Sequence, residues 1–516
     1  MNGPEAKDPS AVTRTAGRGG LAVAFAKLYF ILIGLVQQIV LPRVLGLDGY
    51  GALSSVLSIS SIAYNPIVST SIQGVSRAVA QAPDAEQPQA IRRTLGIHAL
   101  LALPLGLAFF LLARPIGEAA GAPHLVGSLR IVSGVVLFYS LYTPLVGVLN
   151  GQKRFVWQAG LDILYATIRT TLLVGGALFL AAAGGKVAGA STGFVIASGI
   201  IFAIALYVVG VGKAGAGGPT ARTHLGFIAP LLFGQILLNL LLQADLTLLR
   251  AFAAEAAKAA GQGPEAADPI VGAYRATQLF SFLPYQLLLA VTFILFPMLA
   301  TAYRDGDKAA VARYVRAGVR LALILMGLMV SVTSGLSRPL MRLVFPAEAA
   351  TLGGDAMQLL TLGFGAFAIF GILTTVLNSL KREVASMAVT ALAFALVVAL
   401  CFLRVRGTPL GPDILMRTAV ATTSGLALAT LGASFLVLRT AGAVAPLGSF
   451  LRVLVAMTIA IALGRFLPAP GKLLTLVYAA GVGCLYAFVL VATRELGKAD
   501  VDTVKAVLGR KKPTSS

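Results

Sequence analysis

Residues 271–300 read VGAYRATQLFSFLPYQLLLAVTFILFPMLA, a stretch that is long and apolar enough to cross a bilayer as a helix. Within it Arg275, Gln278, Phe282 and Tyr285 recur at intervals of three and four residues, so a helix places them on one face. A cation inside a membrane span costs about 2.5–3.5 kcal/mol on insertion scales and usually faces a cavity or a partner. The alternative is that Arg275 lies near the outer end of the span and reaches the interface.

The composition of the whole chain is that of a polytopic membrane protein. Of its 516 residues 57% are hydrophobic and 12% are charged, whereas soluble domains have about 25% charged residues. Apolar runs long enough to span a bilayer recur from end to end. The net charge is +21, but the basic residues gather in short loops between these runs. This pattern indicates the positive-inside rule, and we expect no nucleic-acid partner.

The apolar runs predict fourteen transmembrane helices. They lie near residues 21–42, 50–73, 95–113, 128–149, 159–182, 187–211, 225–250, 270–300, 317–345, 356–379, 385–403, 414–438, 448–467 and 472–493. If both termini are cytoplasmic, most of the 41 Lys and Arg residues fall on the cytoplasmic side. We therefore expect a multi-pass protein of the cell (inner) membrane with both termini inside.

The chain repeats itself at a nearly constant interval. VLNGQKR at 148–154 returns as VLNSLKR at 376–382, and LARPI at 112–116 returns as LSRPL at 336–340. These repeats predict two lobes of six helices each that point the same way across the membrane, related by an axis along the membrane normal. The last two helices are then an appendage.

This organisation divides the chain into five parts. They are a cytoplasmic tail (1–20), an N-lobe with spans 1 to 6 (21–215), a C-lobe with spans 7 to 12 (220–440), the appended spans 13 and 14 (445–495), and a basic cytoplasmic tail (496–516). Two parallel lobes leave a cleft near their axis, where transporters commonly bind their substrate.

Polar stripes on the helices that open each half are expected to line that cleft. The candidate polar residues are Gln38, Ser58, Asn65, Gln235, Asn239, Gln278 and Tyr285. The alternative is that such side chains form hydrogen bonds between helices and hold the bundle together.

Cations outnumber acids at membrane depth. Lys27, Arg169 and Arg275 lie within spans, and Arg77 stands at the inner end of the second span. The cleft should therefore bind an anion, and arginine suits phosphate because its planar fork donates two hydrogen bonds.

Few acidic residues accompany these cations within the spans. Asp162 lies near the start of the fifth span, seven residues before Arg169. Asp245 is either an ion-pair partner of Arg275 or Arg250 or the acid that couples transport to a cation.

No motif for catalysis or cofactor binding is found in the sequence. The Gly-Lys pairs lack the remainder of a nucleotide-binding loop, and His98, His124 and His224 show no metal-ligand spacing. Cys401 and Cys484 both lie in apolar spans, so no disulfide is expected. The sequence predicts a secondary transporter that is not an enzyme and uses no cofactor or metal.

Three stretches carry a resemblance to a known family. They are IVLPRVLGLDGYGALSSVLSI (39–59), GAYRATQLFSFLPYQLLLAVTFILFPMLA (272–300) and VLNSLKR (376–382). Over about residues 15–440 the chain resembles the Wzx-type polysaccharide-biosynthesis flippases of the multidrug/oligosaccharidyl-lipid/polysaccharide exporter superfamily.

The resemblance implies a flippase with fourteen helices. Such a protein moves an oligosaccharide linked to undecaprenyl diphosphate from the cytoplasmic to the outer leaflet, for assembly of O-antigen, capsule or exopolysaccharide. A cationic central cavity would hold the diphosphate-sugar head while the lipid tail stays in the bilayer. The matching positions here are Lys27, Arg169, Arg275 and Arg77. A polysaccharide polymerase and other assembly proteins are candidate partners.

Three alternatives remain open. A lipid II flippase of the same superfamily shares the cationic cavity, but its opening spans usually carry an Arg-Asp pair that residues 30–75 lack. A cation-coupled multidrug antiporter needs an acid in an opening helix, for which Asp245 is the candidate. A membrane scaffold for glycan-assembly enzymes would need no charged cavity at all.

Overall fold

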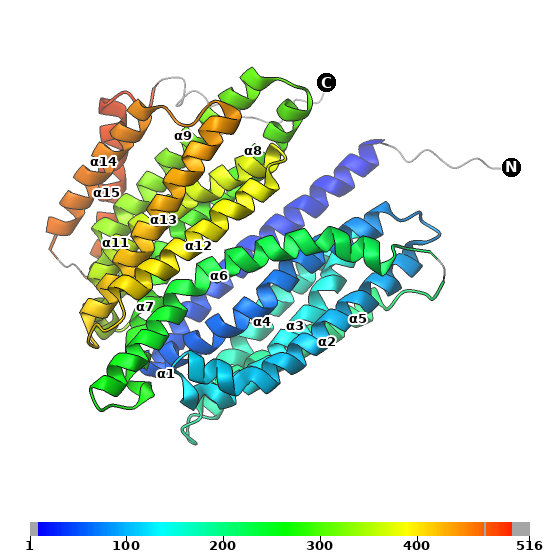
Figure 1. Cartoon of the computed structure of the whole chain (residues 1–516), viewed down its shortest axis with the longest axis horizontal. Coiled ribbons are helices and arrows are strands. Elements are labelled where there is room, and N and C mark those ends of the chain that lie inside the picture. The colour runs from blue at the N-terminus through cyan, green and yellow to red at the C-terminus, as the bar shows by residue number, and fades with distance from the viewer. Residues whose placement is uncertain (1–8, 216, 469–470, 498–516) are drawn as a thin grey trace. The chain divides into compact units, whose positions relative to one another are not determined.

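The computed structural model describes residues 9–215, 217–468 and 471–497, and within them the chain forms helices and no strand (Figure 1). In order these are α1 (Pro9–Gln81), α2 (Gln87–Ala119), η1 (Pro123–Leu125), α3 (Val126–Gly151), α4 (Phe155–Phe179), α5 (Lys186–Val209), α6 (Ala221–Ala259), η2 (Pro264–Ala267), α7 (Asp268–Ser281), α8 (Leu283–Arg304), α9 (Lys308–Gly335), α10 (Ser337–Val344), α11 (Ala347–Ser379), α12 (Glu383–Arg404), α13 (Pro412–Ala441), α14 (Leu447–Phe466) and α15 (Lys472–Ala492).

The structure confirms the prediction of an all-α polytopic membrane protein. In the described part of the chain, twelve helical segments are long and apolar enough to cross a membrane. The exact number of fourteen spans stays a prediction. Two features differ from the expected spans: α1 covers the first two of them, and the stretch 270–300 forms α7 followed by α8, which is itself 22 residues long. Pro284 lies at the start of α8 and has no N–H to donate to the preceding turn.

Helix α1 reverses direction at Gly46. Gly46 has φ 79° and ψ 174°, a conformation that glycine adopts without steric cost. The Tyr50 hydroxyl donates a hydrogen bond of 2.7 Å to Gln38 Oε1. In an uninterrupted helix these residues would lie about 18 Å apart along the axis. The element is therefore a helical hairpin, with a first arm (residues 9–45) and a second arm (residues 47–81).

The described helices group into two compact units. The first unit ends at Gly272 and the second begins at Ala273, while residues 407–410 group with the first. Helix α6 belongs to the first unit because it packs against the second arm, where Ser58 Oγ donates a 2.7 Å hydrogen bond to Gln243 Oε1. The repeat instead places the boundary between residues 215 and 220, and that division into two lobes stays a prediction.

Helices α4 and α5 of the first unit approach each other through glycines. A Cβ atom added at Gly176 would lie 2.2 Å from the carbonyl oxygen of Gly189, and one added at Gly193 would lie 1.9 Å from that of Leu172. Only residues without a side chain allow backbones to come this close. Gly189 and Gly193 are four positions apart, and small residues at this spacing commonly allow membrane helices to pack closely.

In the second unit α11 packs along α13, which in turn packs against α12 (Figure 1). Phenylalanine rings fill the interior of this unit: the centroids of Phe364 and Phe367 lie 6.1 Å apart, and those of Phe367 and Phe370 lie 5.9 Å apart. Near the other end of the chain, the buried carboxylate of Glu495 accepts hydrogen bonds from Arg320 of α9 and Arg452 of α14. This contact holds the segment after α15 against two helices.

The two copies of the repeated motif form the same turn. Lys153 (φ 59°) and Lys381 (φ 55°) both have the left-handed conformation that residues other than glycine rarely adopt. In each copy the lysine N–H donates to the carbonyl of the asparagine three residues earlier, at 3.0 Å and 3.1 Å. A left-handed residue that closes a helix end is a common cap. The sequence repeat therefore corresponds to a repeated backbone structure at these two positions.

Candidate functional site

Three polar contacts join the first arm to α4. They are Lys27 Nζ to Asp162 Oδ2 at 3.0 Å, Tyr29 OH to Thr167 Oγ1 at 2.9 Å, and Thr170 Oγ1 to Gln37 Oε1 at 3.2 Å. Residue numbers increase together along both helices, so the first arm and α4 run parallel. We call these three contacts the polar ladder.

The predicted cavity cation Lys27 therefore has an acidic partner that was not predicted. Its side chain is 59% exposed, whereas that of Asp162 is 13% exposed. Asp162 neutralises part of the positive charge expected here, but the exposed ammonium group can still bind a second anion. An ammonium group has three donors, so the ion pair does not exhaust its capacity.

Arg169 lies on α4 near the polar ladder and has aromatic neighbours. Its guanidinium carbon is 4.9 Å from the ring centroid of Phe30 and 5.7 Å from that of Tyr165. These are cation–π distances. The Nε of Arg169 is buried and has no hydrogen-bond partner among the described residues. A buried donor without a partner costs about 1–3 kcal/mol. The Arg169 residue as a whole is half-buried.

Four tyrosines from three helical segments surround this region. Tyr139 of α3 is at the centre, with ring centroids 5.5 Å from Tyr64 of the second arm, 5.7 Å from Tyr142 of α3 and 5.2 Å from Tyr165 of α4. The Tyr142 hydroxyl is buried without a hydrogen-bond partner in the described chain. Sequence reasoning missed this tyrosine cluster; the three-residue spacing of Tyr139 and Tyr142 was the one signal available for it.

Several predicted cavity residues instead form contacts between or within helices. Gln38 accepts from Tyr50, and Ser58 donates to Gln243. Asn239 of α6 donates to the carbonyl of Gln235 at 2.9 Å. The first two contacts join different helical segments, as in the alternative in which polar side chains hold the bundle together, whereas the third lies within α6. The role of these residues in lining a cavity stays a prediction. The remaining polar candidate of the first unit, Asn65, is half-buried in the second arm one residue after Tyr64.

The acid that forms an ion pair with Arg250 is Asp268, whereas Asp245 was the acid considered from the sequence. This fully buried arginine forms an ion pair with Asp268 and donates to the carbonyl of Pro264 at 3.0 Å. His124 Nε2 lies 3.1 Å from the other carboxylate oxygen of Asp268. Asp245 is also buried and accepts a 2.8 Å hydrogen bond from the N–H of Leu246.

Arg77 has different neighbours from the other cations of the first unit. Its guanidinium carbon lies 4.0 Å from the ring centroid of Phe227 of α6, and its Nε donates to Gln81 at 3.3 Å. The structure therefore associates Lys27 and Arg169 with the same helix, α4, and places Arg77 against α6.

In the second unit, residues of the predicted stripe on α7 and α8 contact one another. Arg275 donates to Gln278 at 3.0 Å, and the ring centroids of Phe282 and Tyr285 are 6.3 Å apart. Tyr285 also packs on Phe367 at 4.8 Å. The grouping of Arg275 with Lys27 and Arg169 around one substrate stays a prediction.

The structure also contains a cavity of about 410 Å³ in the first unit. It lies among α2, α3 and α5, is lined mainly by apolar residues together with Arg92, and includes none of the predicted site residues. In the described ranges, no group of three or more His, Cys, Asp or Glu side chains is arranged to hold a metal ion.

Comparison with known proteins supports the expected relationship. A family model described as "Polysaccharide biosynthesis protein" matches residues 16–302, more than half of the chain. This match confirms the resemblance to the Wzx-type flippases. No curated protein sequence matches the chain.

Solved structures with a similar fold include three transporters. The lipid II flippase MurJ in an inward closed conformation has a TM-score of 0.71 at 15% identity, over 92% of this chain and 99% of that chain. An inward-facing multidrug resistance MATE family transporter of the MOP superfamily has a TM-score of 0.63 at 14% identity, over 80% of this chain and 95% of that chain. A MOP superfamily transporter from Pyrococcus furiosus has a TM-score of 0.58 at 14% identity, over 87% of this chain and 97% of that chain. At these identities the similarity concerns the fold alone.

Proposed function

The chain belongs to the polysaccharide biosynthesis protein family, and on this premise we propose that it is a flippase for an oligosaccharide linked to undecaprenyl diphosphate. It moves this lipid from the cytoplasmic to the outer leaflet of the cell membrane, for polysaccharide assembly. The diphosphate is bound by the cations of α4 and the first arm, and the lipid tail remains in the bilayer.

The observation that carries this proposal is the environment of Arg169. Its Nε is a buried donor without a partner, and two aromatic rings hold the guanidinium group in place. A phosphate oxygen would accept hydrogen bonds from the guanidinium group of this half-buried side chain. Hydrogen bonds between ionised partners are shorter and about twice as strong as those between neutral groups. Arginine also differs from lysine in offering a fork that fits two phosphate oxygens.

Lys27 supplies a second cation to the same substrate. Because its side chain is 59% exposed, it can bind a phosphate while Asp162 remains its neighbour. Asp162 limits the net positive charge of the empty site, so an anion is bound without being held permanently. Release on the opposite side of the membrane requires such a moderate affinity.

The membrane potential favours the proposed direction. Moving a negative charge outward across an inside-negative membrane releases about 2.3 kcal/mol per charge per 100 mV. The protein therefore has to lower the barrier rather than supply the driving force. Without it, the diphosphate and the sugar hydroxyls would enter hydrocarbon with no hydrogen-bond partners.

Binding to the purified protein tests the proposal. The full chain in detergent is titrated with an undecaprenyl-diphosphate-linked oligosaccharide, and the dissociation constant is compared among wild type, Arg169→Ala and Arg169→Lys. We expect the alanine variant to bind roughly 10- to 100-fold more weakly, because a hydrogen bond to a charged group is lost. The lysine variant should be intermediate, since it keeps the charge but loses the fork.

Arg130→Ala is the matched control, because Arg130 is an exposed arginine of α3 beside Phe110. It should bind as the wild type does. Equal affinity of Arg169→Ala and wild type would refute the proposal. Titration with lipid II in parallel separates the alternative flippase: tighter binding of lipid II than of the oligosaccharide lipid would assign the chain to cell-wall precursor transport.

A further inference from the structure

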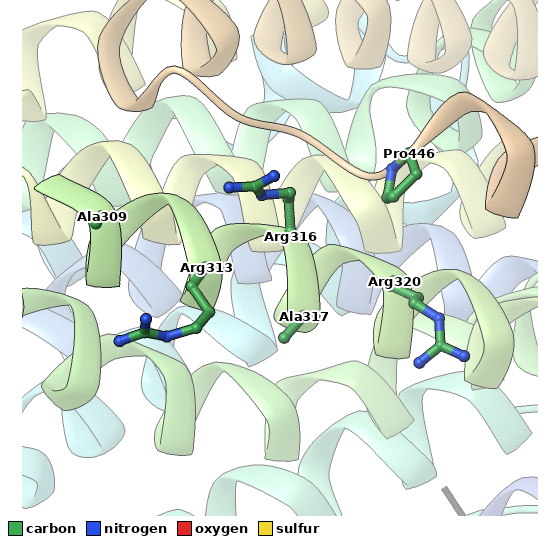
Figure 2. Close-up of a pocket in the computed structure, with 6 residues that line it drawn as sticks. All are labelled: Ala309, Arg313, Arg316, Ala317, Arg320 and Pro446. Atoms are coloured by element: carbon green, nitrogen blue, oxygen red, sulfur yellow. The ribbon is translucent and has the colours of Figure 1, made fainter. Parts of the chain in front are cut away.

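A basic cavity lies along the beginning of α9 in the second unit. Its volume is about 470 Å³, and its lining residues are Ala309, Arg313, Arg316, Ala317, Arg320 and Pro446. We call it the arginine groove. Figure 2 shows Arg316 reaching toward the segment that carries Pro446, with Arg313 and Arg320 one turn away along α9 in either direction.

Two of the three arginines have unused donors. Among the described residues no carboxylate lies within ion-pair distance of Arg313 or Arg316. Arg316 Nε donates to the carbonyl of Ala312, a weak contact at 3.3 Å, and the Arg313 guanidinium carbon lies 5.8 Å from the ring of Tyr314. Because the arginines follow one another at intervals of three and four residues, they lie close along α9 and their charges repel. An anion in the groove would relieve this repulsion.

Arg320 is fixed in position at the end of the groove. Its Nε donates to Glu495 at 2.7 Å, and the other carboxylate oxygen of Glu495 accepts from Arg452 at 3.1 Å. One carboxylate thus accepts hydrogen bonds from two arginines. The contact holds the Arg320 side chain still and reduces the entropy that binding would otherwise cost.

The surroundings of the groove favour an amphiphile over a small free anion. Most of the lining surface is apolar, with small side chains at Ala309 and Ala317 leaving room between the arginines. Exposed apolar residues follow directly in the sequence: Leu321 comes after Arg320, and Leu447 after Pro446. Charged groups next to exposed leucines are typical of the boundary between lipid headgroups and acyl chains.

We propose that the arginine groove binds the phosphate of an anionic phospholipid, at the end of the second unit that the positive-inside rule assigns to the cytoplasm. Basic pockets between membrane helices on this side suit acidic headgroups, and each basic residue near the surface contributes about 1 kcal/mol. The site is formed within the second unit and does not depend on the transported substrate.

Titration of the purified full chain with fluorescent phosphatidylglycerol in a neutral detergent tests the proposal. The double variant Arg313→Ala/Arg316→Ala should bind about 30-fold more weakly than wild type, as expected for the loss of two such contacts. Arg313→Lys/Arg316→Lys keeps both charges and should lie within a few-fold of wild type. Arg465→Ala, at an exposed arginine at the other end of α14, is the control and should not change the affinity.

Two results would overturn the proposal. One is equal affinity of wild type and the double alanine variant, with both shown to be folded by their melting temperatures. The other is displacement of the lipid by inorganic phosphate at a comparable concentration, which would assign the groove to a free anion. Failure here leaves the flippase proposal intact, because that proposal is tested at Arg169 with a different ligand.

Discussion

The ammonium nitrogen of Lys27 lies 3.0 Å from Oδ2 of Asp162, although 135 residues separate the two in the sequence. The pair connects the first arm of α1 to α4, next to Arg169. It sets the charge of the proposed diphosphate site, because it places one acid among the cations that would contact the substrate.

Replacing Asp162 by asparagine should strengthen substrate binding. The change frees the Lys27 charge for the diphosphate, so we expect a several-fold lower dissociation constant, whereas Lys27→Ala should raise it. Titration of both variants with the oligosaccharide lipid measures the effect. If Asp162→Asn weakens binding as much as Lys27→Ala does, the pair serves the fold and not the substrate.

The close approach of α4 and α5 should make Gly176 intolerant of alanine. A Cβ atom there would lie 2.2 Å from the carbonyl oxygen of Gly189, and overpacking of this kind costs about 1–3 kcal/mol. The neighbouring Gly175 has no atom within 4 Å of the same position. Gly175→Ala should therefore leave the melting temperature unchanged or raise it, since alanine favours helix. Equal melting temperatures for the two variants would contradict the packing described.

Asp268→Asn should be strongly destabilising. It would leave the buried Arg250 without its carboxylate, and breaking a buried pair in this way costs about 3–5 kcal/mol. The matched control is Asp355→Asn, which removes the partner of Arg338 in a pair whose side chains are 55% and 54% exposed. Exposed pairs contribute less than about 1 kcal/mol. Thermal unfolding in detergent should show a large drop for the first variant only.

Stability should depend on acid pH through Glu495. Burial raises the pKa of this carboxyl, but hydrogen bonds from Ser449, Arg320 and Arg452 outweigh burial and hold the pKa below its usual value. A carboxyl whose pKa is lower in the folded state stabilises the fold above its unfolded pKa, and this contribution is lost as the pH falls through the folded value. Wild type should therefore melt well above Glu495→Gln at neutral pH.

The difference in melting temperature between these two proteins should shrink as the pH falls below about 4. Glu118→Gln is the control, since Glu118 forms an exposed pair with Arg114 and its removal should change the melting temperature little at any pH. A gap between wild type and Glu495→Gln that stays constant down to acid pH would show that Glu495 acts through packing alone.

Hydrophobic runs and repeats predicted the helical architecture because they are local properties of the chain. The repeated VLNGQKR and VLNSLKR motifs even share a left-handed lysine, at Lys153 and Lys381. The reversal at Gly46 was also implied by the expected end of one span at residue 42 and start of the next at residue 50, although both arms form a single element here.

The partners of the polar residues could not be predicted in the same way. Lys27 meets Asp162, and Ser58 meets Gln243, because particular faces of distant helices turn toward each other. Helical spacing shows which residues of one helix share a face, but not which face of another helix they meet. For the same reason helical spacing does not predict the tyrosine cluster, because Tyr64 and Tyr165 become neighbours of Tyr139 only in the folded chain.

The polar ladder also limits how the first arm can move. Its three contacts lie at different heights along α4, and each joins a side chain of one helix to a side chain of the other. A slide of one helical turn, about 5.4 Å, would separate all three at once. A change of register between the first arm and α4 therefore requires the loss of three side-chain contacts together.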